Sequence, residues 1–234
     1  MKNVIVSLLM LTSSLARCEA NQHAAQTKQE PAKAEAEQKL TRKVEGRVIL
    51  SDELPAARLE FAPEFKYAGG QSFILYNVAR AEQHFFVDAD AQGRIKRLYW
   101  VQFEGYLPDN KHTYNYRSPS TARIGDFDFF ADAAARNLKA GPGRPDSDGA
   151  RAQSFLQSKD HRFASDDVIM QRLVHLTDET KRNELMIIYM EDLSATGLTA
   201  ADLAPSGKDA ARWPEISAGL LERAKAGVKI TRRG

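Results

Sequence analysis

The chain has 234 residues, a formal net charge of +2 and a single cysteine, and 27% of its residues are charged. A chain of this length holds one large domain or two small ones. Its basic residues are interleaved with acidic ones, whereas nucleic-acid binding needs a clustered basic surface. One cysteine also excludes an intramolecular disulfide. We therefore expect a globular protein without a nucleic-acid partner.

The first twenty residues have the pattern of an export signal. Lys2 gives a short positive start, residues 4–15 form an apolar run, and small residues up to Ala20 offer cleavage points. The apolar run is shorter than the about 18 residues that cross a bilayer, and no later stretch reaches that length. The pattern predicts an export signal over residues 1–20, no transmembrane span in the mature chain, and a periplasmic location.

The only cysteine, Cys18, lies within this predicted signal. Residues 15–18 have the outline of a lipobox, which would make Cys18 a lipid-attachment site and the protein a lipid-anchored component of the envelope. Arg17 stands where that site requires a small residue, so soluble export is the favoured prediction. Membrane contact is expected only through acylation of Cys18.

The next segment, residues 21–42, is rich in Ala, Gln, Glu and Lys and contains Pro31. Such a segment buries too little apolar surface to offset the entropy lost on ordering. We expect a flexible polar tether over residues 21–42 and a single globular domain over residues 43–231.

The first half of this domain has the alternation of β-structure. Strands are predicted near Val44 and over residues 47–50, 58–61, 71–78 and 83–88. Residues 90–93 end in a glycine that can adopt a positive φ, which predicts a hairpin loop leading into a long strand over residues 94–106.

Helix signals follow in the middle of the chain. Asp126 is a candidate N-cap for a helix over residues 127–138, which the Gly-Pro-Gly of residues 141–143 would end. Ser147 or Asp148 is a candidate cap for a second helix that ends near Ser158.

The last third combines a hairpin with short helices. Residues 167–176 and 183–192 predict two strands joined by a polar loop, and the apolar run of residues 185–190 is typical of a strand covered on both faces. Thr199 predicts a helical turn ending at Leu203, and Pro214 predicts a closing helix that ends at Ala226. Together these elements predict an α+β fold: a mostly antiparallel, curved sheet built from hairpins, with helices packed on one face.

Known catalytic and ligand-binding motifs are missing from the sequence. It contains no GxSxG, Walker-type, HExxH or CxxC motif. His84, His112, His161 and His175 are not at metal-ligand spacing from one another. We therefore expect neither a metal site nor a cofactor.

The strand over residues 94–106 is the first candidate binding element. Alternation places Arg97 and Tyr99 on one face and Trp100, Glu104 and Tyr106 on the other, so both faces mix aromatic and polar groups. A lined cavity would produce such mixing. The simpler interpretation, a wide strand with one solvated face, is favoured.

Two further candidates come from the second half. Tyr114 and Tyr116 stand two apart on an extended segment and could stack on a ligand, although a strand packed on the long hairpin is the favoured interpretation. In the second hairpin, Arg172 and His175 stand opposite Glu184, which general acid–base chemistry or a plain ion pair would equally explain.

Three functions are compatible with these patterns. The leading hypothesis is an exported, non-enzymatic domain that binds a small, partly apolar molecule or an envelope protein. The second is an enzyme whose site joins His84 or His175 with Glu104 or Glu184. The third is a structural or assembly protein of the envelope, which would expose an apolar patch.

Overall fold

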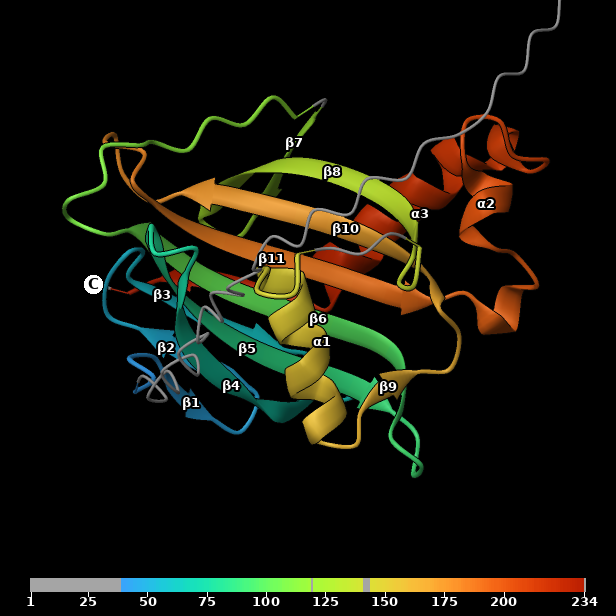
Figure 1. The fold of residues 1–234 in the computed structure, drawn as a ribbon, viewed down its shortest axis with the longest axis horizontal. Coiled ribbons are helices and arrows are strands. Elements are labelled where there is room, and N and C mark those ends of the chain that lie inside the picture. The colour runs from blue at the N-terminus through green and yellow to red at the C-terminus, as the bar shows by residue number, and fades with distance from the viewer. Residues whose placement is uncertain (1–38, 119, 141–143, 234) are drawn as a thin grey trace, which may run out of the picture. The chain divides into compact units, whose positions relative to one another are not determined.

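The computed structural model describes residues 39–118, 120–140 and 144–233. The predicted export signal, Cys18 and most of the predicted tether lie outside these residues, and so does the Gly-Pro-Gly segment. The described residues form two antiparallel sheets with a few packed helices (Figure 1), which confirms the predicted α+β class.

The large sheet has the strand order β4-β5-β6-β11-β10-β8-β7, and the short β9 pairs in parallel with one end of β6. Its strands are β4 (Lys66–Leu75), β5 (Ala79–Ala89), β6 (Arg94–Tyr106), β7 (Ser120–Ile124), β8 (Phe127–Asn137), β9 (Arg162–Phe163), β10 (Asp167–Leu176) and β11 (Asn183–Asp192). The small sheet has the order β1-β2-β3-β12, formed by β1 (Lys43–Glu45), β2 (Val48–Ser51), β3 (Ala57–Phe61) and β12 (Val228–Arg232). Strand β12 was not predicted.

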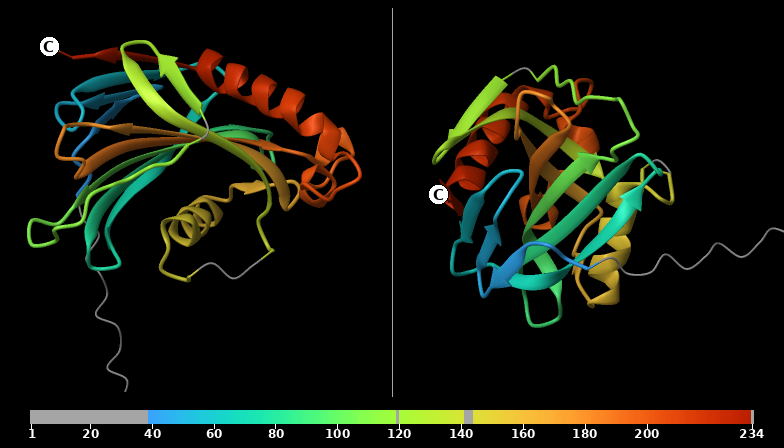
Figure 2. Two further views of the ribbon diagram at one scale, coloured as in Figure 1. Left: turned by 90° about the horizontal axis from the view of Figure 1, so that it is seen from above. Right: turned by 90° about the vertical axis from the view of Figure 1, so that its left-hand side faces the viewer.

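Helices lie on both sides of the curved large sheet (Figure 2), and not on one side only. Helix α1 (Asp148–Ser158) packs on the side that carries Trp100, which we call the α1 face. Helix α3 (Trp213–Ala226) packs on the side that carries Tyr99, the α3 face, together with the small sheet and the short helix α2 (Ala200–Leu203). Two 3-10 turns, η1 (Ser194–Thr196) and η2 (Ala210–Arg212), complete the elements. None of the helices in the described residues is long and apolar enough to cross a membrane.

The predicted hairpins are confirmed. Strands β6, β10 and β11 have the predicted bounds, whereas β5 begins at Ala79, before the predicted residue 83. Strand β11 is buried from Glu184 to Met190, as expected of a strand covered on both faces. The helix caps are confirmed as well: Ser147 accepts a hydrogen bond from the Ala150 N–H at the start of α1, and Thr199 forms a capping box with Asp202 at α2.

The predicted helix over residues 127–138 is wrong, because this segment is strand β8. Its first half alternates with a period of two, and Phe127, Phe129 and Ala131 are buried against the α3-face core. Gly125, with φ of 55°, makes the tight turn that joins β7 to β8. The helix-favouring alanines after Ala131 are overridden by pairing with β10.

A β-bulge distinguishes the edge strand β4. The register between β4 and β5 shifts between Tyr67 and Gly69, which allows the Tyr67 hydroxyl to reach His84 across Gly70. A Cβ atom at Gly70 would lie 2.6 Å from the Gln83 carbonyl oxygen and 2.8 Å from the Tyr67 hydroxyl. The close approach of the β5 backbone and the Tyr67 side chain therefore requires glycine at position 70.

We predict that Gly70→Ala lowers the free energy of unfolding by about 2 kcal/mol or more, because the backbone of β5 must shift. Gly149→Ala is the matched control, since a Cβ atom there meets nothing within 4 Å, and alanine in a helix should stabilise by up to about 1 kcal/mol. Urea unfolding of both variants measures the difference. Equal stability of the two variants would contradict the proposed requirement.

Candidate functional site

Two glutamates face each other on the α1 face near one end of the large sheet. Glu104 of β6 and Glu184 of β11 are direct cross-strand partners, and we call them the carboxyl pair. Only 3% of Glu184 is exposed. Carboxylates directly opposite one another repel, so two ionised groups at this position would be unfavourable.

Two tyrosines from the extended segment before β7 contact this pair. The Tyr114 hydroxyl donates to Glu104 Oε1 at 2.8 Å, and the Tyr116 hydroxyl donates to Glu184 Oε2 at 2.5 Å. The segment is held in place by a hydrogen bond from the Tyr114 N–H to the Lys181 carbonyl at 2.8 Å. Segments distant in the sequence thus meet at one site.

Three glutamines extend the site across the sheet. Gln71 of β4, Gln83 of β5 and Gln102 of β6 are cross-strand neighbours, and each Nε2 donates to the next Oε1 at 2.7 Å. Gln102 Nε2 then donates to Glu104 Oε2 at 2.6 Å. This glutamine ladder therefore ends on a carboxylate that accepts, which fixes the orientation of every amide in it.

Burial dominates the electrostatics of the carboxyl pair. It raises the pKa of Glu184 to about 8, and Glu104 contributes further by repulsion. Burial also raises the pKa of Glu104, although Tyr114 and Gln102 donate hydrogen bonds to it. At neutral pH the pair therefore holds a proton, preferentially on Glu184, because that carboxyl has fewer donors.

Arg172 lies beside the pair without neutralising it. Its guanidinium forms an ion pair with Asp132 of β8 at 2.8 Å and lies 5.5 Å from the centre of the Tyr116 ring. Its charge lowers the pKa of Glu184 only in part, because burial has the larger effect. Tyr106 stacks on Tyr114 with ring centres 4.5 Å apart.

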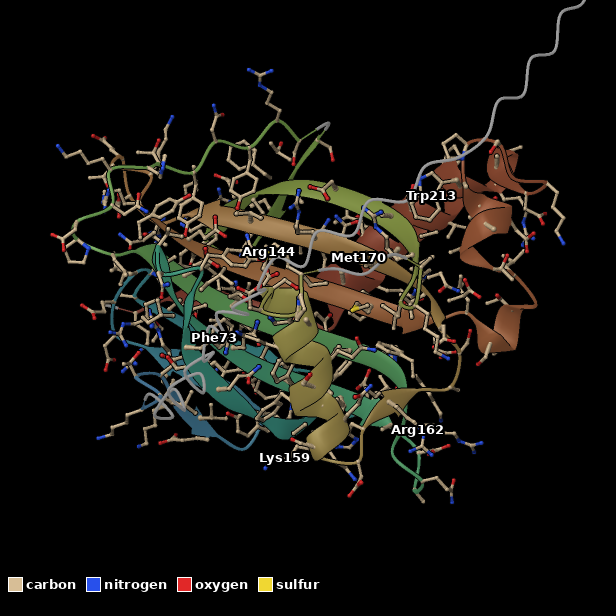
Figure 3. All side chains as sticks on the ribbon, viewed as in Figure 1. Phe73, Arg144, Lys159, Arg162, Met170 and Trp213 are labelled. Atoms are coloured by element: carbon tan, nitrogen blue, oxygen red, sulfur yellow. The ribbon has the colours of Figure 1, made fainter. Side chains whose placement is uncertain are left out.

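Beyond the carboxyl pair and the glutamine ladder, the α1 face is apolar. Five buried side chains form a floor under α1: Phe85, Trp100, Met186, Ile188 and Met190. Ala152 and Leu156 of α1 pack on this floor, and Met170 of β10 lies on the same side of the sheet as α1 (Figure 3). Trp100 is only 8% exposed, yet its indole Nε1 has no hydrogen-bond partner among the described residues.

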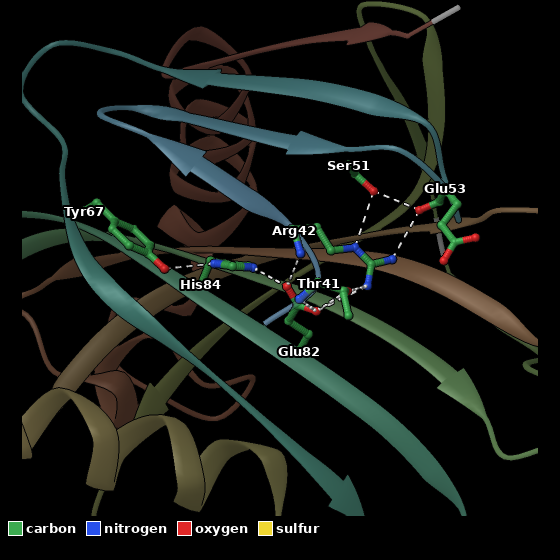
Figure 4. Close-up of polar contacts among 7 residues, drawn as sticks. All are labelled: Thr41, Arg42, Ser51, Glu53, Tyr67, Glu82 and His84. Carbon is green, nitrogen blue, oxygen red and sulfur yellow. Dashed lines mark hydrogen bonds and ion pairs between the residues drawn. The ribbon is translucent and has the colours of Figure 1, made fainter. Parts of the chain in front are cut away.

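A second polar cluster lies on the α3 face of β5 (Figure 4). Glu82 accepts hydrogen bonds from the Thr41 N–H at 3.0 Å, the Thr41 hydroxyl at 2.6 Å and the Arg42 N–H at 2.9 Å. His84 Nε2 lies 2.9 Å from Glu82 Oε1, and the Tyr67 hydroxyl lies 3.0 Å from His84 Nδ1. Although burial opposes ionisation, these donors together lower the pKa of Glu82 to about 2.

This cluster anchors the start of β1 to β5. Each oxygen of Glu82 contacts groups of the protein itself, and His84 is fully buried. Because its hydrogen bonds are satisfied within the chain, we assign it a structural role. A Tyr–His–Glu arrangement resembles an acid–base relay in outline, but here it binds the incoming chain.

The structure separates the residues that the sequence singled out into two groups. Glu104, Tyr106, Tyr114, Tyr116 and Arg172 come together on the α1 face, with Trp100 on the adjoining floor. Three others lie on the α3 face or its rim: Arg97, Tyr99 and His175. The two tyrosines of residues 114–116 do project to one side, although their segment is extended and not a strand of the sheet.

The residues on the α3 face have other partners. Arg97 forms ion pairs with Asp88 and Glu64 at 2.7 and 3.3 Å. The Tyr99 hydroxyl donates to the Ala224 carbonyl at 2.7 Å and holds α3 against the sheet. His175 lies 2.9 Å from the Asp128 carbonyl oxygen.

The histidine–glutamate combinations expected of an enzyme are not formed. His84 contacts Glu82, and neither His84 nor His175 lies on the face of the carboxyl pair. Sequence reasoning missed the glutamine ladder and the direct pairing of the two glutamates. The alternation within β6 placed Gln102 beside Glu104, but only the register between strands brings Glu184 opposite.

Two cavities of about 270 and 360 Å³ lie elsewhere. The first is bounded by the α3 side of β8 and β10 and by α3, and the second by the β7–β8 turn, the end of α3 and β12. The described residues contain no group of three or more His, Cys, Asp or Glu side chains that could hold a metal ion. Comparison of the chain with protein-family models, with curated proteins and with solved structures finds no match.

We predict that Glu184→Gln removes a pH-dependent loss of stability. The folded state binds the Glu184 proton more tightly than the unfolded state, in which the pKa is near 4.5, so stability falls as the pH rises from about 4.5 to 8. The variant should match the wild type at pH 5 and exceed it by on the order of 3 kcal/mol at pH 9. Urea unfolding at both pH values measures this, with the exposed Glu179→Gln as control. Parallel pH profiles for wild type and E184Q would contradict the protonated pair.

The opposite pH dependence is expected for Glu82→Gln. The donors around Glu82 favour its charged form, so its contribution is full above pH 4.5 and is lost as the pH falls toward 2. At pH 7 the variant should be less stable by on the order of 3 kcal/mol, and the difference should shrink in acid. Chemical unfolding between pH 7 and 3 tests this against the exposed Glu53→Gln. A deficit that persists unchanged at pH 3 would disprove the assigned ionisation.

Proposed function

We propose that this protein is a non-enzymatic binding domain that holds a small, partly apolar molecule between α1 and the floor of the large sheet. The observation that carries the proposal is the buried Trp100 Nε1–H, which lacks an acceptor among the described residues. A buried donor without a partner costs roughly 1–3 kcal/mol, and a ligand acceptor would recover that cost.

The surroundings of Trp100 support the same ligand class. The floor supplies aromatic, aliphatic and thioether surface, which suits an apolar body. Four residues farther along β6, about 13 Å in an extended strand, stands the carboxyl pair. With a proton on Glu184 at neutral pH, this pair is also a hydrogen-bond donor. Two donors, one on the apolar floor and one at the carboxyl pair beyond Gln102, match a neutral, elongated molecule with hydrogen-bond acceptors, such as a ketone or an ester.

Entry of the ligand requires α1 to move, because its side chains cover the floor. The contact is small: Ala152 and Leu156 are the buried residues of α1, and Phe155 stacks on Phe85 with ring centres 5.1 Å apart. A helix held by so few apolar side chains is displaced at modest cost compared with a core element.

The proposal is tested on the indole N–H signals of the two tryptophans, Trp100 and Trp213, in ¹H–¹⁵N NMR spectra. Trp213 stands at the start of α3, away from α1 (Figure 3), and Trp213→Phe assigns the remaining signal to Trp100. Added 2-decanone should shift the Trp100 signal downfield in a saturable way and leave the Trp213 signal in place, because a carbonyl accepts from the indole N–H.

Two comparisons make this test specific. Ala152→Phe should fill the space over the floor and abolish the shift, whereas Ser154→Phe on the exposed side of α1 should preserve it. n-Decylamine should shift the signal far less, because its ammonium group offers no acceptor. An unmoved Trp100 signal, or an equal response to the amine, would overturn the proposal.

A further inference from the structure

A cavity of about 270 Å³ lies between α3 and the α3 face of the large sheet. Its walls include Ser120 of β7, Ala133 of β8, Gln171 of β10, and Trp213, Ser217 and Leu221 of α3. The volume is close to the lower end of the range for small-molecule sites, which is about 300 Å³. The carboxyl pair and Trp100 lie on the opposite face of the sheet, so this cavity is separate from the site proposed above.

The amide of Gln171 supplies an acceptor that the fold leaves free. Gln171 lies opposite Ala133 and is only 2% exposed. Its Nε2 donates to the carbonyls of Asp132 and Arg172 at 2.9 and 3.2 Å, which uses both N–H groups. These carbonyls fix the orientation of the amide, because the reversed amide would place its oxygen against them. The Oε1 atom accepts no hydrogen bond from the described residues and is not enclosed by them, so it is open to a molecule in the cavity.

The two serines in the lining are also restricted to accepting. Ser120 Oγ donates to the Ala131 carbonyl at 3.0 Å, and Ser217 Oγ donates to the Pro214 carbonyl at 3.1 Å. A hydroxyl group has one proton, so each of these oxygens has only lone pairs left for a ligand. The side-chain oxygens of the cavity therefore match a molecule that donates hydrogen bonds.

The rest of the lining favours an apolar body and a positive charge. Trp213 and Leu221 pack against the α3-face core and are partly exposed, and the indole ring has a face that attracts cations. Among the described residues that line the cavity, none is Lys, Arg or His. The one charged residue is Asp132, whose carboxylate is bound by Arg172 and Ser118. An anion would therefore find no cationic side chain in this lining.

We propose that this cavity binds a small primary ammonium compound with an apolar body, and that Gln171 Oε1 accepts a hydrogen bond from the ammonium group. An ammonium group has three N–H donors and no acceptor, which matches oxygens that can only accept. The apolar body packs on Trp213 and Leu221. This ligand class differs from the neutral molecule with acceptors proposed for the α1 face, so the two sites are distinguished by charge and by face.

Binding is measured on the full chain by ¹H–¹⁵N NMR, with the indole N–H signal of Trp213 as reporter. At pH 7, 2-phenylethylamine should shift this signal in a saturable way and leave the Trp100 signal in place. The net charge of +2 means that the chain as a whole does not attract the amine. Neutral 2-phenylethanol, with a single donor, should bind about tenfold more weakly.

Phenylacetate is the decisive comparison, because it can accept from the Trp213 N–H but cannot donate. It should not bind measurably. An unmoved Trp213 signal with the amine, or equal affinities for the amine and phenylacetate, would overturn the proposal. Neither result would affect the test at Trp100, which uses a different ligand and a different signal.

Two variants locate the amine. Gln171→Leu removes the acceptor with little change in volume and should raise the dissociation constant about tenfold. Ser217→Phe should fill the cavity and abolish binding while Gln171 stays in place. Ala226→Phe adds the same ring at an exposed position near the other end of α3 and should preserve binding. If S217F, shown to be folded by its dispersed amide spectrum, binds the amine like the wild type, the cavity is not the site.

Discussion

The pairing of β6 with β11 is the constraint on which the rest of this structure depends. These two strands lie side by side through the middle of the large sheet, and their aligned residues alternate strictly between its two faces. One set, with Tyr99 and Tyr189, joins the α3-face core; the other, with Trp100 and Ile188, forms the floor under α1. Because the period is two, the same register that builds both cores also brings Glu104 opposite Glu184. A one-residue register shift would separate the carboxyl pair only by exchanging the faces of both cores.

Environment, and not residue type, gives the buried glutamates opposite properties. Glu82 accepts from backbone N–H groups, a hydroxyl and His84, so its charge is stabilised in spite of burial. Glu184 is similarly buried but accepts from one tyrosine and faces another carboxyl, so its neutral form is favoured. The first arrangement binds the start of β1 to β5, whereas the second leaves a donor beside the glutamine ladder, on the same face as the apolar floor. Only the carboxyl pair offers a hydrogen-bond donor that the fold itself does not use.

Local signals in the sequence predicted most of the helices and strands, but they could not predict the register between strands that are distant in the sequence. The hairpins followed from turn residues and alternation, and the caps of α1 and α2 from single side chains that bond to nearby backbone. The error at residues 127–138 has a clear cause: the alanine-rich end of β8 favours a helix locally, and its pairing with β10 outweighs that preference. For the site, Glu104 and Trp100 were identified on one strand face, but their partners Glu184 and Phe85 depend on pairing across the sheet.

Arg172 connects the carboxyl pair with strand β8. Its guanidinium is bound to Asp132, and its charge also acts on Glu184, so each acid competes for the same cation. Asp132 in turn also accepts a hydrogen bond from the Ser118 hydroxyl at 3.2 Å. Weaker binding of Arg172 to Asp132 frees the guanidinium to stabilise the charged form of Glu184. The proton on the carboxyl pair therefore depends on the ion pair between Arg172 and Asp132, although β10 and β11 separate β8 from Glu104.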